Sequence, residues 1–220
     1  MGNIVMSYAP STFQAGTGED FFLKEGYLTG MAPIISARYT IPAFDGQDGI
    51  AMTISGSVAK ASYGNSESWA GWNLGATYTK LLLVAYVQPG NTRAYMGIGA
   101  KVDVIPVGSI KPDAYQTRYA DAYGAADMGK YVGTSYTSLA SETTILQDSA
   151  LTAPVWGIAF YLDPTLGSEV LKTFFKTGSS KWFQTMEVTG DTAHTSFQSV
   201  YLRYDGDDCR YITPIMVWGS

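Results

Sequence analysis

The C-terminal residues 199–212 constrain the fold of this chain more than any other stretch. The segments on either side of Asp205-Gly206 alternate apolar and polar residues. Asp-Gly between two alternating segments is the strongest local signal for a β-hairpin, because a type I′ turn needs positive φ at both central residues. A two-residue turn would place Arg203 opposite Asp208, as a cross-strand ion pair. The sequence therefore predicts a C-terminal β-hairpin and a β-rich fold.

The rest of the chain follows the same pattern. The run Leu81–Val87 is apolar at every position, which is typical of a central strand buried on both faces. Turn markers such as Pro89-Gly90 separate the segments. Short strands between turns favour an all-β fold, a two-sheet antiparallel sandwich or jelly roll. The predicted strands are Ile4–Tyr8, Ser36–Ile41, Ile50–Ala61, Thr79–Gln88, Arg93–Val107, Val155–Leu162, Glu169–Thr177, Lys181–Thr189, Phe197–Tyr204 and Asp207–Trp218, with Glu169–Thr177 and Lys181–Thr189 paired as a second hairpin.

The length of 220 residues suits one large all-β domain better than two small ones. We expect an irregular N-terminal arm and wrapping segment over residues 1–33 and a single β-sandwich over residues 34–220. Within the arm, only Phe21-Phe22-Leu23 offers an apolar anchor. The arm either reaches a neighbouring subunit or wraps its own domain, and the sequence leaves both interpretations open.

Composition restricts the partners of the chain. Its 14 basic residues do not cluster and its net charge is −5, which argues against nucleic acid because phosphate binding depends on Lys and Arg. Charged residues make up 15% and Tyr numbers 16, so the surface suits protein or sugar. The first residues lack the basic and apolar regions of a signal peptide, and Leu81–Val87 is too short to span a membrane. The single cysteine, Cys209, excludes an internal disulfide.

One segment departs from the β pattern. Pro112 opens a stretch in which Tyr115, Tyr119 and Tyr123 recur every four residues, and Gly124 follows. A proline near the start, an i,i+4 stripe and a closing glycine predict a short helix. The stripe is either a packing face against the sandwich or an exposed aromatic patch for a protein partner.

The sequence offers few groups for catalysis. The only histidine, His194, lies in a turn-rich segment with no nucleophile-elbow pattern around it. Glycoside hydrolysis needs two carboxylates at a set separation, and Glu142, Asp148, Glu169 and Glu187 show no such pairing. We therefore expect no enzyme and no cofactor.

Metal binding is the weaker of two interpretations of the Asp-Gly segments. Asp45–Gly49 and Asp205–Asp208 cluster the oxygen ligands that calcium prefers, yet neither matches an EF-hand loop. Asp and Gly are also the residues that a bare turn prefers. We expect turns at both places, and we assign no metal site.

The tryptophans divide into two groups. Trp156 and Trp218 lie in apolar segments and are predicted to be core residues. Trp69 and Trp72 lie in a polar segment that we predict to be a loop. An exposed indole there could stack on a sugar ring, so these two residues are the candidate ligand-binding groups.

Several segments resemble, in order and character, the strands of concanavalin A-like (laminin G-like) jelly rolls. They are Thr79–Val87, Tyr95–Lys101, Gly157–Asp163 and Lys172–Trp182, followed by Phe197–Val200 and Pro214–Trp218. Such domains occur in surface proteins of tailed-bacteriophage virions, as capsid decorations and fibres. The resemblance covers residues 50–218. It implies a sandwich fold, but the lectin metal and sugar residues have no counterparts here.

The resemblance and the composition together favour a non-enzymatic structural protein of the virion surface, attached to head or tail as a homo-oligomer through other virion proteins. In that hypothesis, the N-terminal arm and the Tyr115, Tyr119 and Tyr123 stripe form the attachment surface. A second hypothesis is a carbohydrate-recognition domain that binds host-surface glycans through Trp69 and Trp72. A third is a glycan hydrolase, which would need paired acids in a groove.

Overall fold

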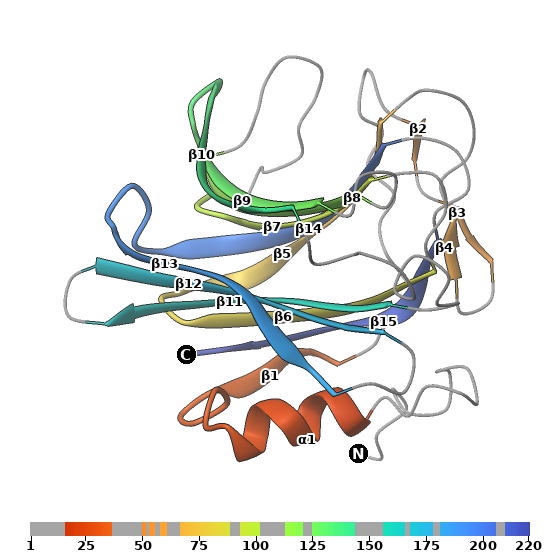
Figure 1. Ribbon diagram of the computed structural model, residues 1–220, viewed down its shortest axis with the longest axis horizontal. Coiled ribbons are helices and arrows are strands. Elements are labelled where there is room, and N and C mark those ends of the chain that lie inside the picture. The colour runs from red at the N-terminus through yellow and green to blue at the C-terminus, as the bar shows by residue number, and fades with distance from the viewer. Residues whose placement is uncertain are drawn as a thin grey trace.

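The chain is a two-sheet β-sandwich in the computed structural model (Figure 1). The structure describes residues 16–36, 50–51, 53–55, 58–60, 67–88, 93–101, 113–120, 125–143, 156–165, 168–177, 181–205 and 210–220. Nearly all pairing among the described strands is antiparallel; the short β2–β5 contact is parallel. The all-β prediction and the two-sheet architecture are confirmed.

The first sheet contains eight described strands in the order β13-β12-β11-β6-β15-β4-β3, with β1 pairing with β15. Their bounds are β1 Ala32–Ser36, β3 Thr53–Ser55, β4 Val58–Lys60, β6 Leu81–Gln88, β11 Trp156–Thr165, β12 Ser168–Thr177, β13 Phe183–Asp191 and β15 Arg210–Gly219. The predicted pairing of the segments around residues 169–177 and 181–189 is confirmed, because β12 and β13 are antiparallel neighbours.

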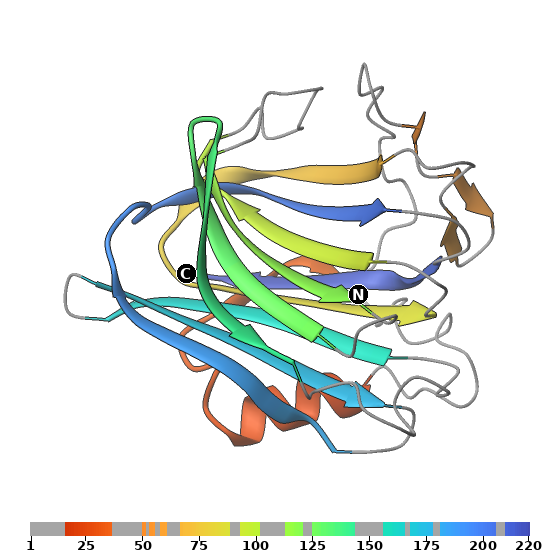
Figure 2. The same cartoon turned by 45° about the horizontal axis from the view of Figure 1, so that its top comes forward.

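The second sheet contains seven described strands in the order β10-β9-β8-β7-β14-β5-β2. Their bounds are β2 Ile50–Ala51, β5 Glu67–Tyr78, β7 Arg93–Gly99, β8 Ala114–Ala120, β9 Ala125–Val132, β10 Ser135–Glu142 and β14 Phe197–Asp205. The two sheets lie face to face, and the β9–β10 hairpin bends up and away from the first sheet (Figures 1 and 2).

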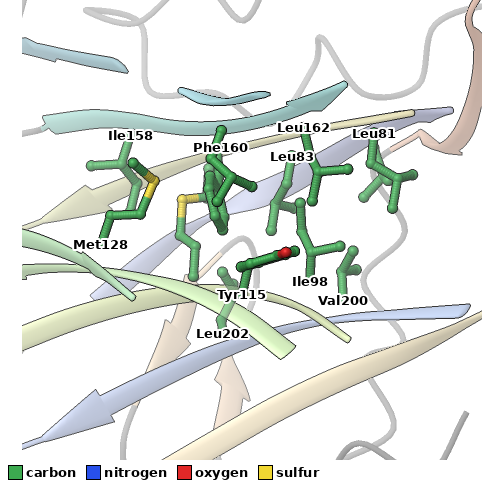
Figure 3. Packing of buried hydrophobic residues seen from close by; sticks show 14 of the residues in the cluster. Leu81, Leu83, Ile98, Tyr115, Met128, Ile158, Phe160, Leu162, Val200 and Leu202 are labelled. Carbon is green, nitrogen blue, oxygen red and sulfur yellow. The ribbon is translucent and has the colours of Figure 1, made fainter. Parts of the chain in front are cut away.

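The main core lies between the sheets, where alternate residues of each strand meet (Figure 3). Leu81 and Leu83 of β6 face this core, whereas Leu82 and Val84 face the opposite side of the sheet, and all four side chains are fully buried. The expectation of a central strand buried on both faces is confirmed, since β6 pairs with β11 on one side and β15 on the other.

A helix forms a third layer on the outer face of the first sheet (Figure 1). Helix α1, Gly16–Lys24, places the ring of Phe22 5.2 Å from that of Phe174 and 5.1 Å from that of Trp182. Tyr27 follows the helix, and the centroid of its ring lies 4.9 Å from that of Tyr161. Residues 16–36 thus wrap their own domain, as one of the two interpretations of the arm required. No helix in the described part of the chain is long and apolar enough to cross a membrane.

The predicted C-terminal hairpin is wrong. Strand β14 pairs with β5 and β7 in the second sheet, whereas β15 pairs with β6, β4 and β1 in the first. The two strands therefore do not pair with each other, and Arg203 pairs with Trp69 and Tyr95. The physical reason is that each strand gains ladder partners on both sides in separate sheets, which outweighs one local turn preference.

The predicted helix over residues 112–124 is also wrong, because residues 114–120 form strand β8. An i,i+4 spacing satisfies the strand period of two as well as the helix period of 3.6. Tyr115, Thr117 and Tyr119 share one face of β8, and all three are fully buried. The tyrosine stripe is a packing face, and Tyr123 lies outside the described residues.

Candidate functional site

The outer face of the second sheet carries a group of tyrosine and polar side chains. Met96 and Ile98 of β7 face the core, so Tyr95 and Gly97 between them face outward. The same alternation applies to β8, β9 and β14. We call the outward group the tyrosine face; it comprises Tyr95, Gln116, Arg118, Asp127, Tyr131, Tyr136 and Tyr201.

Strand register arranges the tyrosine face in rows across the sheet. In one row, Asp127 of β9 is paired with Arg118 of β8, which is paired with Tyr95 of β7. Two rows away, Tyr131 of β9 is paired with Tyr136 of β10, and the middle row between them contains Gly97, Gln116 and Gly129. The sheet therefore brings together side chains from strands far apart in sequence.

The middle row contains glycines, and tyrosine rings lie over them. A Cβ atom at Gly97 would stand only 1.9 Å from Cζ of Tyr201, so this ring occupies the space that a side chain at position 97 would take. The Tyr201 hydroxyl donates to Oε1 of Gln116 at 3.0 Å. Both side chains are almost completely buried. This part of the face is a packed polar layer.

Tyr136 is the accessible part of the tyrosine face. Its phenol end fills the space above Gly129, where a Cβ atom would stand 2.4 Å from the hydroxyl oxygen. Tyr136 is 40% exposed, and the neighbouring Tyr131 ring lies 4.9 Å away at a tilt of 50°. The hydroxyl donates to Oδ1 of Asp127 at 3.0 Å. Partial burial, together with the charge and hydrogen bond of Asp127, raises the pKa of the Tyr136 hydroxyl.

An ion pair lies beside this ring. The Arg118 guanidinium pairs with the Asp127 carboxylate, so Asp127 accepts hydrogen bonds from Arg118 and from Tyr136 at once. The Arg118 side chain is 31% exposed, although its Nε atom is buried and has no hydrogen-bond partner among the described residues. The site thus joins a half-exposed aromatic ring to charged donors and an acceptor held in fixed positions.

A second polar cluster fixes the end of the sandwich where the β13–β14 connection crosses from one sheet to the other. Asp191 accepts from the Tyr115 hydroxyl at 2.5 Å and from the Ala193 amide at 2.9 Å, and it forms an ion pair with Lys130. Burial alone would raise the pKa of Asp191, but the bonds from Lys130, Tyr115 and Ala193 outweigh it and lower the pKa.

The same cluster holds the β9–β10 hairpin that carries Tyr136. His194, which is buried, places Nε2 2.7 Å from the Tyr131 carbonyl oxygen. Asp113 forms an ion pair with Lys101 and accepts from the Gly133 amide at 2.6 Å, and both bonds lower the pKa of Asp113. His194 joins the core to the hairpin, since its amide donates to the Tyr115 hydroxyl, its ring packs on Tyr115 and its Nε2 meets the Tyr131 carbonyl.

The structure separates the residues that the sequence proposed for binding. Tyr115 and Tyr119 lie in the core, so an exposed attachment patch built on them is wrong. Trp69 and Trp72 lie in strand β5, not in a loop. In the backbone register, Trp69 lies in the same row as Arg203 and Tyr95. Trp72 is paired with Val200. The side chains of Trp69 and Trp72 lie outside the described part of the structure.

The segments considered for metal binding fall mostly on residues that the structure does not describe. Asp45–Gly49 and residues 206–209, which include Cys209, lie outside the described residues. Within the described ranges, no group of three or more His, Cys, Asp or Glu side chains is placed to hold a metal ion.

Sequence reasoning missed Tyr136 and its neighbours because it predicted no strands between residues 112 and 143. Strand β10, SYTSLASE, and strand β9, AADMGKYV, are rich in Ser, Ala, Gly and Asp, which have low β propensity. The one local signal was Gly133-Thr134 between Tyr131 and Tyr136. Gly133 has a φ of 59°, as the first residue of a two-residue hairpin turn requires.

No family model and no curated protein matches this chain. Among solved structures it is similar to the carbohydrate-binding module CBM66 from Bacillus subtilis, with a TM-score of 0.49 and 9% identity over 87% of this chain and 96% of that one. It is also similar to lectin II from Ulex europaeus, with a TM-score of 0.48 and 10% identity over 87% and 92%. For lectin I-B4 from Griffonia simplicifolia the TM-score is 0.47, with 11% identity over 86% of this chain and 90% of that one.

Proposed function

We propose that this chain is a non-enzymatic carbohydrate-binding module whose ligand lies against Tyr136 on the tyrosine face. The observation that carries the proposal is the position of this ring. Tyr136 is one of the few large apolar side chains in the described part that is substantially exposed, and it lies directly beside the Arg118–Asp127 ion pair.

The chemistry of the site suits a neutral sugar. A sugar ring has an apolar face bounded by hydroxyl groups, and the exposed ring of Tyr136, which packs against the buried ring of Tyr131, offers an apolar surface for that face. Arg118 can donate to a hydroxyl oxygen, and Asp127 can accept from a hydroxyl hydrogen. Because these two charges compensate each other, the site has no excess charge to favour an anionic ligand.

The same residues support binding over hydrolysis. Among the described side chains of the tyrosine face, Asp127 is the one carboxylate, and Arg118 and Tyr136 both hold it. Glycoside hydrolysis needs a pair of carboxyl groups across the scissile bond. A single, charge-paired carboxylate provides a hydrogen-bond acceptor but neither a general acid nor a second nucleophilic group.

The experiment is a screen of the protein on a glycan array, followed by calorimetric titration of each ligand found. Tyr136→Ala should weaken binding at least tenfold, and Tyr136→Phe should retain most of it because the ring remains. Phe183→Ala is the matched control, since Phe183 is 44% exposed but lies on β13 at the edge of the first sheet. Binding that is unchanged in Tyr136→Ala, or an array without any ligand, would overturn the proposal.

The virion location stays a prediction from the resemblance. The attachment surface predicted at Tyr115 and Tyr119 is absent, and residues 1–15 of the arm lie outside the described residues. A carbohydrate-binding module is compatible with a position on a bacteriophage surface, where it would bind host glycans. Detection of the protein in purified particles by mass spectrometry would test that setting.

A further inference from the structure

Strand β10 is the edge of the second sheet among the described strands. Its first four residues, Ser135 to Ser138, are all exposed, and its only charged residue is Glu142 at the far end. Exposed edge strands usually carry a lysine, a proline or an inward charge that prevents pairing with another strand. Residues 135–138 carry none of these, and the register shift of β10 between Ser138 and Ala140 lies beyond them, so they are a competent surface for adding a strand.

Hydrogen-bond alternation identifies which backbone groups face this edge. Val132 and Ser135 flank the two-residue turn, so they form a hydrogen-bonded pair with each other. The next pair, Tyr131 with Tyr136, is then non-hydrogen-bonded, and the alternation continues as far as Ser138, after which the register shifts. The N–H and C=O groups of Tyr136 and Ser138 therefore point away from β9, toward the open edge.

We infer that two copies of this chain associate by antiparallel pairing of their β10 strands across a two-fold axis at Thr137. In this register, Tyr136 of one copy pairs with the Ser138 position of the other. The pairing uses every outward backbone group of residues 136–138, and it joins the two second sheets into one continuous sheet.

A second copy is the occupant that fits best for two reasons. The exposed half of β10 is uncharged, so its self-pairing places no like charges opposite each other. Isologous two-fold contacts also need only one self-complementary patch. A Tyr136 ring would lie opposite a small serine side chain on the same face, so the aromatic rings of the two copies do not collide.

The pairing of two β10 strands has a consequence for glycan binding, which can be tested separately from dimerisation. Two copies joined at β10 would present their Tyr136 rings on one continuous face. If the proposed glycan binding holds, the dimer would be bivalent for a repeating polysaccharide. Dimerisation can be measured without any glycan, so failure of either proposal would be distinguishable from failure of the other.

The first test is sedimentation velocity over a range of protein concentrations. The wild-type chain should reach the mass of a dimer. Ser138→Pro should remain monomeric and folded, because proline there removes only an N–H that faces the open edge. A wild-type protein that stays monomeric at every concentration would overturn the inference, and so would an equally dimeric Ser138→Pro variant.

The second test does not depend on the folding of the proline variant. Two Thr137 residues would meet as a non-hydrogen-bonded pair with Cα atoms about 4.5 Å apart, within the range of a disulfide. Thr137→Cys, made with Cys209→Ala, should form a disulfide-linked dimer under mild oxidation. Thr189→Cys in the same background is the control, since Thr189 is an exposed residue of β13. Equal cross-linking of the two variants would contradict the β10 interface.

Discussion

The Tyr115 hydroxyl donates a hydrogen bond of 2.5 Å to Oδ1 of Asp191, and this bond joins the two sheets. Tyr115 lies on β8 in the second sheet, whereas Asp191 ends β13 in the first. Lys130 of β9 pairs with the other carboxylate oxygen. One side chain of the first sheet is thereby fixed to two strands of the second, next to the hairpin that carries Tyr136.

Asp191→Asn should destabilise the protein by about 1–3 kcal/mol. The amide keeps an acceptor for Tyr115, but it leaves the partly buried Lys130 without its counter-charge. Glu187→Gln is the control, since Glu187 pairs with Lys172 at 3.4 Å on the surface, where such pairs contribute about 0–1 kcal/mol. Urea denaturation of both variants measures the difference. Equal losses of unfolding free energy in the two variants would show that the Asp191 cluster stabilises the fold no more than a surface ion pair does.

Stability should fall in acid because the folded-state pKa values of Asp113 and Asp191 are both lowered from 3.8. A carboxyl group with a depressed folded-state pKa stabilises the fold fully above its unfolded-state pKa, and this contribution is lost as the pH falls through the folded-state pKa. Denaturant unfolding from about pH 5 to about pH 2 should show the loss. The double variant Asp113→Asn with Asp191→Asn should show a smaller pH slope than the wild type; an unchanged slope would assign the loss to other groups.

Phe22→Ala should release helix α1 from the first sheet and cost about 3–5 kcal/mol, the usual range for a buried phenylalanine. Its neighbour Leu23 is 62% exposed, so Leu23→Ala should change stability by no more than about 0.5 kcal/mol. Limited proteolysis after residue 24 and amide hydrogen exchange in α1 would report the release. Protection in α1 that survives Phe22→Ala would contradict the docking of this ring.

Gly97→Ala should destabilise the second sheet by about 1–3 kcal/mol, because the added methyl group would overlap the ring of Tyr201. The cost should shrink in a Tyr201→Ala background, since the overlapping ring is then absent. A double-mutant cycle by urea denaturation measures this coupling. Additive losses would mean that the clash at Gly97 involves another group.

Part of the fold could be predicted from local pattern. The apolar run Leu81–Val87 identified β6, because a strand buried on both faces usually has an almost continuous run of apolar residues. The antiparallel pair of β12 and β13 was predicted from two alternating segments. The candidate site could not be predicted, because Asp127 and Tyr136 belong to strands whose composition gives little β signal, and the tyrosine spacing around Arg118 favoured a helix.

The sequence by itself determined the β class, the sandwich architecture and the central strand, since these follow from side-chain periodicity and burial within single segments. Only the tertiary structure decided that β14 and β15 enter different sheets and that Tyr115 is a strand residue. It alone also placed Tyr136 over Gly129 beside Asp127. The physical reason is that strand pairing is non-local: a segment's partners are selected by the total burial and hydrogen bonding of the whole sheet, which no single segment encodes.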